Sequence, residues 1–215
     1  MKFRCPFLLL IILLVQIGCT SSKEPADIPL FDGKTFSGWQ GDTLKTWKIM
    51  DNAITGGSLS DTVPHNDFLC TTQSFDNFIL KLKFKLEGNE GFINAGVQFR
   101  SQRATDPAFE MIGYQADMGQ NYYGVLYDES RRNKVLAGPD SATSASIVRL
   151  GEWNDYEIRA EGQRIQLFLN GQQTVDYTEA DLTLPKEGLI GLQIHGGGKA
   201  LVSYKDIVIR KIPNL

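Results

Sequence analysis

Cysteine is scarce in this 215-residue chain, which contains three. Two of them, Cys5 and Cys19, flank an N-terminal apolar run, so Cys70 alone remains for the rest of the chain. One cysteine cannot form an internal disulfide or a cysteine-cluster metal site, and a hydrophobic core must therefore hold this part together. Cys70 lies within Phe68–Thr72, a pattern typical of a buried strand residue rather than of a nucleophile.

The chain also has no excess of positive charge, since 22 basic side chains stand against 25 acidic ones and the formal net charge is −3. Binding to nucleic-acid phosphates needs a basic surface, so the composition excludes a nucleic-acid partner. A content of 42% hydrophobic and 22% charged residues excludes a disordered chain. The length suits one well-buried domain and is too short for two.

No apolar run is long enough to cross a membrane as a helix, which takes about 20 residues. The longest run, Phe7–Val15, follows the basic residues Lys2 and Arg4 and is typical of a targeting segment. It leads into Val15-Gln16-Ile17-Gly18-Cys19, which resembles a bacterial lipobox. An ordinary secretory signal with a chance cysteine is the alternative.

The lipobox interpretation divides the chain into three parts. We expect residues 1–18 to be a lipoprotein signal peptide and residues 19–28 to be a polar tether, with the folded domain at 29–215. Cys19 would carry the lipid and attach the protein to a membrane. The expected location is the bacterial cell envelope, periplasmic or outer-membrane.

Apolar and polar residues alternate with period two through most of the remaining sequence, as in strands with one buried face. Leu80, Leu82 and Phe84 share one face of such a run. The pairs Asp51-Asn52 and Asn170-Gly171 each separate two runs and predict tight hairpins. No window of a dozen residues carries a helical apolar stripe. We therefore predict an all-β fold, a two-sheet antiparallel β-sandwich of the jelly-roll type.

Three of the predicted strands carry glycines and amides where other strands carry charged side chains. Their polar positions are Asn94, Gly96, Gln98 and Arg100, then Gly113, Gln115 and Asp117, then Gly191, Gln193 and His195. Glycine weakens a strand unless something approaches its backbone closely. The pattern predicts the floor of a groove for a hydroxyl-rich ligand. The alternatives are an amide-rich solvent face and buried polar residues that link the sheets.

Two further segments could contribute to such a groove. The aromatic strand that contains Tyr127 leads into the charged run Glu129–Lys134, which includes Arg131. A charge run is usually a solvated loop, but this one could equally hold a substrate. His195 precedes three glycines, whose backbone can fold around a ligand, although a lone histidine is more often structural. His65 lies in a predicted turn and is not a candidate.

Taken in order, these motifs resemble the 3-keto-disaccharide hydrolase family, which is similar in fold to concanavalin-like jelly rolls. The resemblance runs from about residue 29 to 212. The matching segments are Leu30–Lys34, Gly38-Trp39, Asn94–Arg100, Gly113–Asp117, Gly124–Arg132, Trp153-Asn154, Asn170-Gly171, Gly191–Gly196 and Tyr204–Ile207. One departure concerns the second strand, because many members have Glu where this chain has Gln115 and Gln near the position of Asp117.

The resemblance implies cleavage of glycosides whose sugar carries a ketone at C3. The ketone acidifies the hydrogen on C2, so that a base can remove it, the aglycone leaves C1 by β-elimination, and water adds to the enone. The site needs a base, an acid and a cation for the enolate oxygen. The implied catalytic residues are His195, Asp117, Glu129 and Arg100, and the implied substrate-binding residues are Asn94, Gln98, Gln115, Tyr127, Arg131 and Gln193.

Other interpretations of the same residues stay open. A non-catalytic, lectin-like lipoprotein would bind an oligosaccharide or glycoside without turnover. An ordinary glycosidase would use Asp117 and Glu129 as a carboxyl pair about 5–10 Å apart. Sugar-facing Asp and His could also hold a divalent cation, but two or three mixed ligands are a weak metal signal.

The lipobox interpretation predicts that Cys19→Ser abolishes membrane attachment, because the lipid is bonded to the cysteine thiol. Wild-type protein should partition into the detergent phase and the variant into the aqueous phase. Cys70→Ser serves as the control and should partition as the wild type does. A Cys19→Ser protein that stays as membrane-bound as the wild type would show that the interpretation is wrong.

Overall fold

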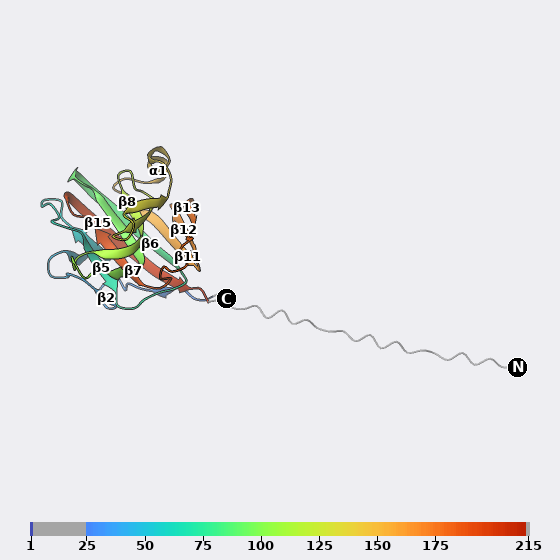
Figure 1. Ribbon diagram of the computed structural model, residues 1–215. Coiled ribbons are helices and arrows are strands. Elements are labelled where there is room, and N and C mark those ends of the chain that lie inside the picture. The colour runs from blue at the N-terminus through green and yellow to red at the C-terminus, as the bar shows by residue number, and fades with distance from the viewer. Residues whose placement is uncertain (2–24, 214–215) are drawn as a thin grey trace.

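The computed structural model describes residue 1 and residues 25–213, so residues 2–18 of the predicted signal peptide and Cys19 lie outside the described part. Two antiparallel sheets pack face to face, and one short helix, α1 (Ser141–Ile147), lies at one end of them (Figure 1). This arrangement confirms the predicted all-β sandwich. Within residues 25–213 no helix has the length and apolar character needed to span a membrane.

The larger sheet contains eight strands and carries the long strands of the sandwich. These strands are β1 (Ile28–Pro29), β3 (Trp47–Met50), β4 (Ala53–Gly57), β6 (Phe78–Gly91), β11 (Asn154–Glu161), β12 (Arg164–Leu169), β13 (Gln172–Thr178) and β15 (Gly198–Lys211). Their order is β13-β12-β11-β6-β15-β4-β3, with β1 paired to β15. Asp51 and Asn52, at φ 49° and 58°, and Asn170 and Gly171, at φ 49° and 80°, make tight turns. Both predicted hairpins are confirmed.

The smaller sheet contains seven strands and carries the candidate site residues. Its strands are β2 (Trp39–Gln40), β5 (Asp67–Thr71), β7 (Asn94–Arg103), β8 (Met111–Gly119), β9 (Leu126–Glu129), β10 (Lys134–Ala137) and β14 (Leu189–Ile194). Their order is β10-β9-β8-β7-β14-β5-β2. Alternation predicted the longer strands β7, β8 and β14, but it missed β2 and β10, which have few residues to alternate.

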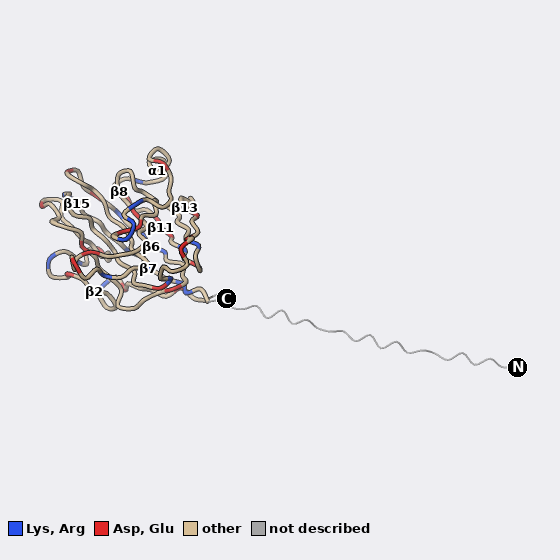
Figure 2. The backbone as a smooth tube through the Cα atoms, in the orientation of Figure 1, with Lys and Arg blue, Asp and Glu red and all other residues tan. Residues whose placement is uncertain are grey.

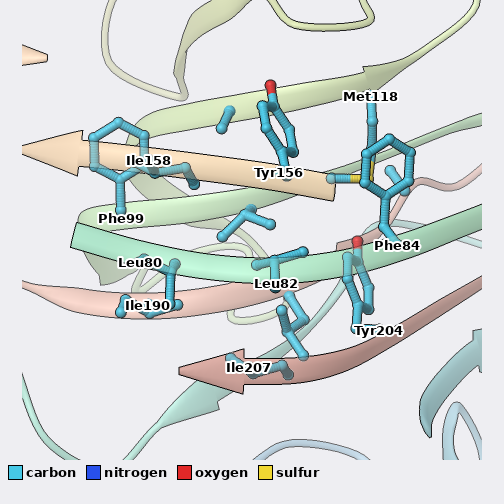
Figure 3. Close-up of a cluster of buried hydrophobic side chains, with 14 of the residues drawn as sticks. Leu80, Leu82, Phe84, Phe99, Met118, Tyr156, Ile158, Ile190, Tyr204 and Ile207 are labelled. Atoms are coloured by element: carbon cyan, nitrogen blue, oxygen red, sulfur yellow. The ribbon is translucent and has the colours of Figure 1, made fainter. Parts of the chain in front are cut away.

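The hydrophobic core fills the space between the two sheets. Leu80, Leu82 and Phe84 project from β6, as the alternation predicted, and each is at most 3% exposed. Phe99 and Ile190 reach them from the smaller sheet (Figure 3). The opposite sides of the sheets therefore face away from the core, and on β7, β8 and β14 these are the sides with the amides and glycines.

The outer face of the larger sheet is an ordinary solvated surface. Lys81 pairs with Glu157 at 3.5 Å and Lys83 with Asp155 at 2.9 Å, across β6 and β11. Figure 2 shows basic and acidic residues interspersed along the chain. Exposed pairs of this kind contribute little to stability, typically less than about 1 kcal/mol each.

Two buried tyrosines join the sheets by hydrogen bonds as well as by packing. Tyr204 on β15 points its hydroxyl at the carbonyl oxygens of Gly96 and Gln193, at 3.0 and 2.7 Å. Tyr156 on β11 donates to the carbonyl oxygen of Asp117 at 3.0 Å. The larger sheet thus supports the backbone of three strands directly beneath the candidate site.

We predict that Tyr204→Phe lowers the free energy of unfolding by about 1–3 kcal/mol, because buried carbonyl groups lose a hydrogen-bond donor. Urea unfolding followed by fluorescence measures the change. Tyr122→Phe is a matched control, since the Tyr122 hydroxyl has no hydrogen bond to the described residues. Equal stabilities of the two variants would contradict the role given to the Tyr204 hydroxyl.

Candidate functional site

Strand register brings the predicted polar residues together on the outer side of the smaller sheet. Gln98 on β7 lies opposite Gln115 on β8, which lies opposite Tyr127 on β9. One row further along, Gly96 lies between Asp117 and Gln193. Period-two alternation therefore placed these side chains on a common face correctly.

The side chains on this face hydrogen-bond to one another. Asn94 Nδ2 donates to Asp117 Oδ1 at 2.8 Å, and Gln98 Nε2 donates to Gln115 Oε1 at 3.0 Å. The Gln115 side chain lies across Gly96, where an added Cβ would come within 2.5 Å of Gln115 Cδ. The glycine is thus needed for the amide to lie flat on the sheet. We call Asn94, Gln98, Gln115, Asp117 and Gln193 the polar layer.

The polar layer is buried rather than open, since each of its five members is at most 4% exposed. The end of the β7–β8 hairpin folds over the sheet and covers part of it. Met111 Sδ lies 3.3 Å from Cys70 Sγ, and its sulfur occupies the space beside Gly191. The structure therefore differs from the expected open groove. It confirms Cys70 as a buried strand residue, and burial raises the pKa of its thiol to about 11.

Residues 104–110, which we call the roof segment, connect β7 to β8. Asn66 Nδ2 donates to Glu110 Oε1 at 2.8 Å, and Asn66 Oδ1 accepts from the backbone N–H of Gly196 at 3.0 Å. Asn66 therefore ties the roof segment to the turn that follows His195. Glu110 is half-buried at this junction.

Several buried polar atoms of the site have no hydrogen-bond partner in the described part of the chain. They are both amide atoms of Gln193, Asn94 Oδ1 and Glu110 Oε2. Buried polar atoms in folded proteins are nearly always hydrogen-bonded to protein or water. These four atoms thus mark a place where a hydroxyl-bearing ligand or water would find both donors and acceptors.

The carboxyl groups at the site hold their protons unusually tightly. Burial raises the pKa of Asp117 to about 7, although the hydrogen bond from Asn94 opposes the shift. Burial and the nearby Glu110 raise the pKa of Glu129 to about 7. Burial also raises the pKa of Glu110. At neutral pH the site therefore holds carboxyl groups that can give or take a proton.

His195 is neutral at pH 7 and has a defined tautomer. Its Nδ1 lies 2.6 Å from the carbonyl oxygen of Gly196, and a carbonyl can only accept, so Nδ1 carries the proton and Nε2 holds a lone pair. Burial lowers the pKa of His195, against the effect of this hydrogen bond. The half-buried ring can therefore act as a base through Nε2.

Arg100 does not join the polar layer, contrary to the prediction from alternation. A β-bulge between Phe99 and Gln102, with Arg100 at φ 48°, interrupts the period of two. The guanidinium instead donates to the carbonyl oxygens of Asp76 and Gly162 and to Asn77 Oδ1, at 2.7–2.9 Å. It therefore joins loops at the edge of the sandwich. Ser101 lies on the polar face in the place expected for Arg100, and its hydroxyl donates to Gln98 Oε1 at 2.7 Å.

Arg131 is also committed elsewhere, so its predicted substrate contact is not supported by its position. Its Nε donates to Asp128 Oδ1 at 2.9 Å, and its guanidinium lies 4.5 Å from the centre of the Tyr114 ring. Asp128 is fully buried on the core side of β9. Within the charged run, Glu129 therefore lies on the outer side of the smaller sheet, whereas Arg131 is bonded to Asp128 on the core side.

Sequence reasoning missed Glu110 and Asn66. Both lie in connecting segments, where no periodicity indicates the direction of a side chain. Glu110 lies in Ala108-Phe109-Glu110-Met111, and the apolar residues around an isolated carboxyl were the one available signal. Within residues 25–213 there is no group of three or more His, Cys, Asp and Glu that could hold a metal ion. A divalent cation at the site stays a prediction.

Two antiparallel sheets packed face to face place this chain in the class of jelly-roll β-sandwich domains. Residues 26–210 match the family described as the 3-keto-alpha-glucoside-1,2-lyase-like domain, and the chain belongs to this family. A 3-keto-disaccharide hydrolase of Bacteroides thetaiotaomicron is 26% identical over 172 aligned residues, and the match covers 70% of this chain. The match spans 58% of the length of that relative.

Solved structures share the fold at low sequence identity. A protein of Parabacteroides distasonis, described as a candidate glycosyl hydrolase, aligns with a TM-score of 0.62 and 21% identity over 87% of this chain and 100% of that one. The carbohydrate-binding module CBM66 from Bacillus subtilis aligns with a TM-score of 0.63 and 16% identity, over 81% and 96%. These likenesses confirm the concanavalin-like jelly roll.

The raised pKa of Asp117 predicts a pH dependence of stability. The folded protein binds this proton more tightly than the unfolded chain, whose Asp has its ordinary pKa of 3.8. The free energy of unfolding should therefore fall as pH rises from about 4 to about 7. In Asp117→Asn the free energy of unfolding should fall less over this pH range, by up to about 4 kcal/mol. The figure follows from the pKa difference between the folded and unfolded states at about 1.4 kcal/mol per pKa unit.

Urea unfolding between pH 4.5 and pH 7.5 measures the effect. Asp155→Asn, on the solvated face of the larger sheet, is the matched control and should unfold with the wild-type pH dependence. An Asp117→Asn protein with the same pH dependence as the wild type would show that Asp117 is ionised in the folded state at neutral pH.

Proposed function

We propose that this domain cleaves 3-keto-glycosides by proton abstraction at C2, β-elimination of the aglycone and hydration. The observation that carries the proposal is the Asn66 side chain, which joins Glu110, a carboxyl group with a raised pKa, to the backbone N–H next to His195, whose pKa is lowered. Elimination needs a base and an acid that both work near neutral pH. The family of the chain supports the choice of substrate.

His195 is the proposed base. Its Nε2 lone pair takes the hydrogen from C2, and the electron pair of that bond passes into the enolate of the C3 ketone. The enolate then expels the aglycone oxygen from C1, and a C1–C2 double bond forms. Addition of water returns a hydroxyl to C1 and a hydrogen to C2, which yields a 3-keto sugar. The hydrogen bond from Nδ1 to Gly196 keeps the ring in the required tautomer.

Glu110 and Glu129 together are the proposed source of the proton for the leaving oxygen. Burial, and after it the charge of Glu110, raises the pKa of Glu129 to about 7, so a proton is available there near neutral pH. Asn66 connects Glu110 to the backbone beside His195, and this connection lets the acid and the base contact the same substrate molecule. Asp117 is a positioning residue in this scheme, because its buried carboxyl group accepts a hydrogen bond from the amide of Asn94.

The enolate oxygen needs a hydrogen-bond donor in place of the expected arginines, which are engaged elsewhere. Gln193 Nε2 is fully buried and has no partner in the described chain. It is the proposed donor to the enolate oxygen, and Gln193 Oε1 would accept from a sugar hydroxyl. A preorganised neutral donor of this kind can supply several kcal/mol of transition-state stabilisation.

The second candidate function is carbohydrate binding without turnover. The observation in its favour is that neither Arg100 nor Arg131 reaches the polar layer, where an enolate would need charge compensation. An ordinary two-carboxylate glycosidase is less well supported, because Asp117 is 4% exposed and bonded to Asn94 and to the Met118 N–H. As predicted from the sequence, the protein would act in the cell envelope through a lipid on Cys19.

The proposal predicts turnover of a 3-keto-glucoside in deuterium oxide with one solvent deuterium at C2 of the product, because abstraction and hydration exchange that hydrogen. His195→Gln should lower kcat by about 10² or more, with substrate retention nearly unchanged. Mass spectrometry and NMR of the product report the label.

Glu157→Gln, on the solvated face of the larger sheet, should match the wild type. Turnover that leaves C2 unlabelled would exclude elimination and favour direct hydrolysis. Saturable binding without turnover would support the binding protein instead.

A further inference from the structure

Two partly exposed phenylalanines lie next to the two histidines of the domain. The Phe109 ring, in the roof segment, stacks on His65 at 4.3 Å between centroids with 20° between planes. The Phe92 ring contacts His195 at 4.6 Å, edge to face. Phe92 is 41% exposed and Phe109 is 39% exposed. Each ring therefore offers an apolar surface that the protein itself does not cover.

The turn of glycines after His195 brings these two pairs together. Gly196 packs so closely on the His65 backbone that an added Cβ would lie 2.5 Å from His65 Cα. The next glycine, Gly197, accepts the backbone N–H of Phe92 at 3.1 Å and donates to the Val63 carbonyl at 2.8 Å. The His65–Phe109 and His195–Phe92 pairs thus lie on either side of one glycine turn.

Each pair combines an apolar ring with a hydrogen-bonding atom. His65 Nδ1 lies 2.7 Å from the Asn66 carbonyl oxygen and His195 Nδ1 lies 2.6 Å from the Gly196 carbonyl oxygen, so in both rings Nδ1 donates and Nε2 remains for a ligand. The polar layer adjoins the pairs, because Asn94 follows Phe92 by two residues and Gln193 precedes His195 by two. Both amides have buried atoms without partners in the described chain.

A pyranose ring matches this combination. Its C–H faces pack against aromatic rings, and its rim of hydroxyls needs acceptors and donors at the edges. A flat phenolic aglycone would use the rings but leave His65 Nε2 and Asn94 Oδ1 unpaired. We propose that Phe92 and Phe109 are the walls of a subsite for a pyranose leaving group. The proposal rests on the proposed function and names the part of the substrate that this end of the site selects.

The test compares two 3-keto substrates that differ only in the leaving group. 3-Keto-maltose leaves a glucose, whereas methyl 3-keto-α-glucoside leaves methanol and cannot fill the subsite. We expect Phe92→Leu and Phe109→Leu each to lower kcat/KM for 3-keto-maltose at least 10-fold, through KM, with less than a twofold change for the methyl glycoside. Phe168→Leu, on the outer face of the larger sheet beside Arg159, is the matched control and should leave both values unchanged.

The ratio of the two kcat/KM values separates the subsite from general damage, because partial misfolding lowers both values equally. An unchanged ratio in both Leu variants would overturn the subsite. Phe92→Tyr, which keeps the ring, should retain the wild-type ratio.

A wild-type protein that turns over neither substrate would overturn the proposed function, and calorimetric binding then tests the subsite alone. Wild type should bind 3-keto-maltose at least 10-fold more tightly than methyl 3-keto-α-glucoside, and the Leu variants should lose this preference. Equal affinities in the wild type would overturn the subsite as well.

Discussion

Five polar side chains are buried on the outer side of the smaller sheet, and their hydrogen bonds govern how the site is built. A buried amide or carboxyl without a partner costs about 1–3 kcal/mol or more. The polar layer avoids most of this cost, since Asn94 bonds to Asp117 and Gln98 bonds to Gln115. Gln193 remains unsatisfied within the described chain. The fold therefore keeps hydrogen-bonding capacity unused at one place, which is what a site for a hydroxyl-rich ligand requires.

The polar layer is held in place by contacts on both of its sides. From below, Tyr204 and Tyr156 reach from the larger sheet to the carbonyl groups of the strands that carry the layer. From above, the roof segment closes over it and is held by Asn66. Side chains pressed from both sides have few alternative rotamers, and preorganised donors and acceptors bind a ligand with less loss of entropy.

The proposed role of each titratable group at the site follows from its burial and its hydrogen bonds. The Asp117 carboxyl is already bonded to Asn94 and to the Met118 N–H, so it acts through Asn94, whereas Gln193 offers a substrate atoms that are unpaired in the described chain. His195, Glu110 and Glu129 are half-buried and can also touch a substrate. Burial serves the chemistry in both places, because it raises the pKa values of the carboxyls and lowers that of the histidine. Proton donors and acceptors that differ little in proton affinity exchange protons readily at neutral pH. The same amides would serve a binding module, so the titratable groups are what distinguish an enzyme here.

Local sequence patterns were enough to predict the sandwich, both tight hairpins and the common face of Gln98, Gln115, Asp117 and Gln193, because alternation and positive-φ turn residues are local properties. The remaining features of the site depend on contacts between distant parts of the chain. A bulge turned Arg100 to the edge of the sandwich, and a hairpin end folded over the sheet to bring Glu110 to Asn66 and close the expected groove. Periodicity carries no information across a bulge or through a loop, since the direction of a side chain there depends on contacts with residues far away in the chain.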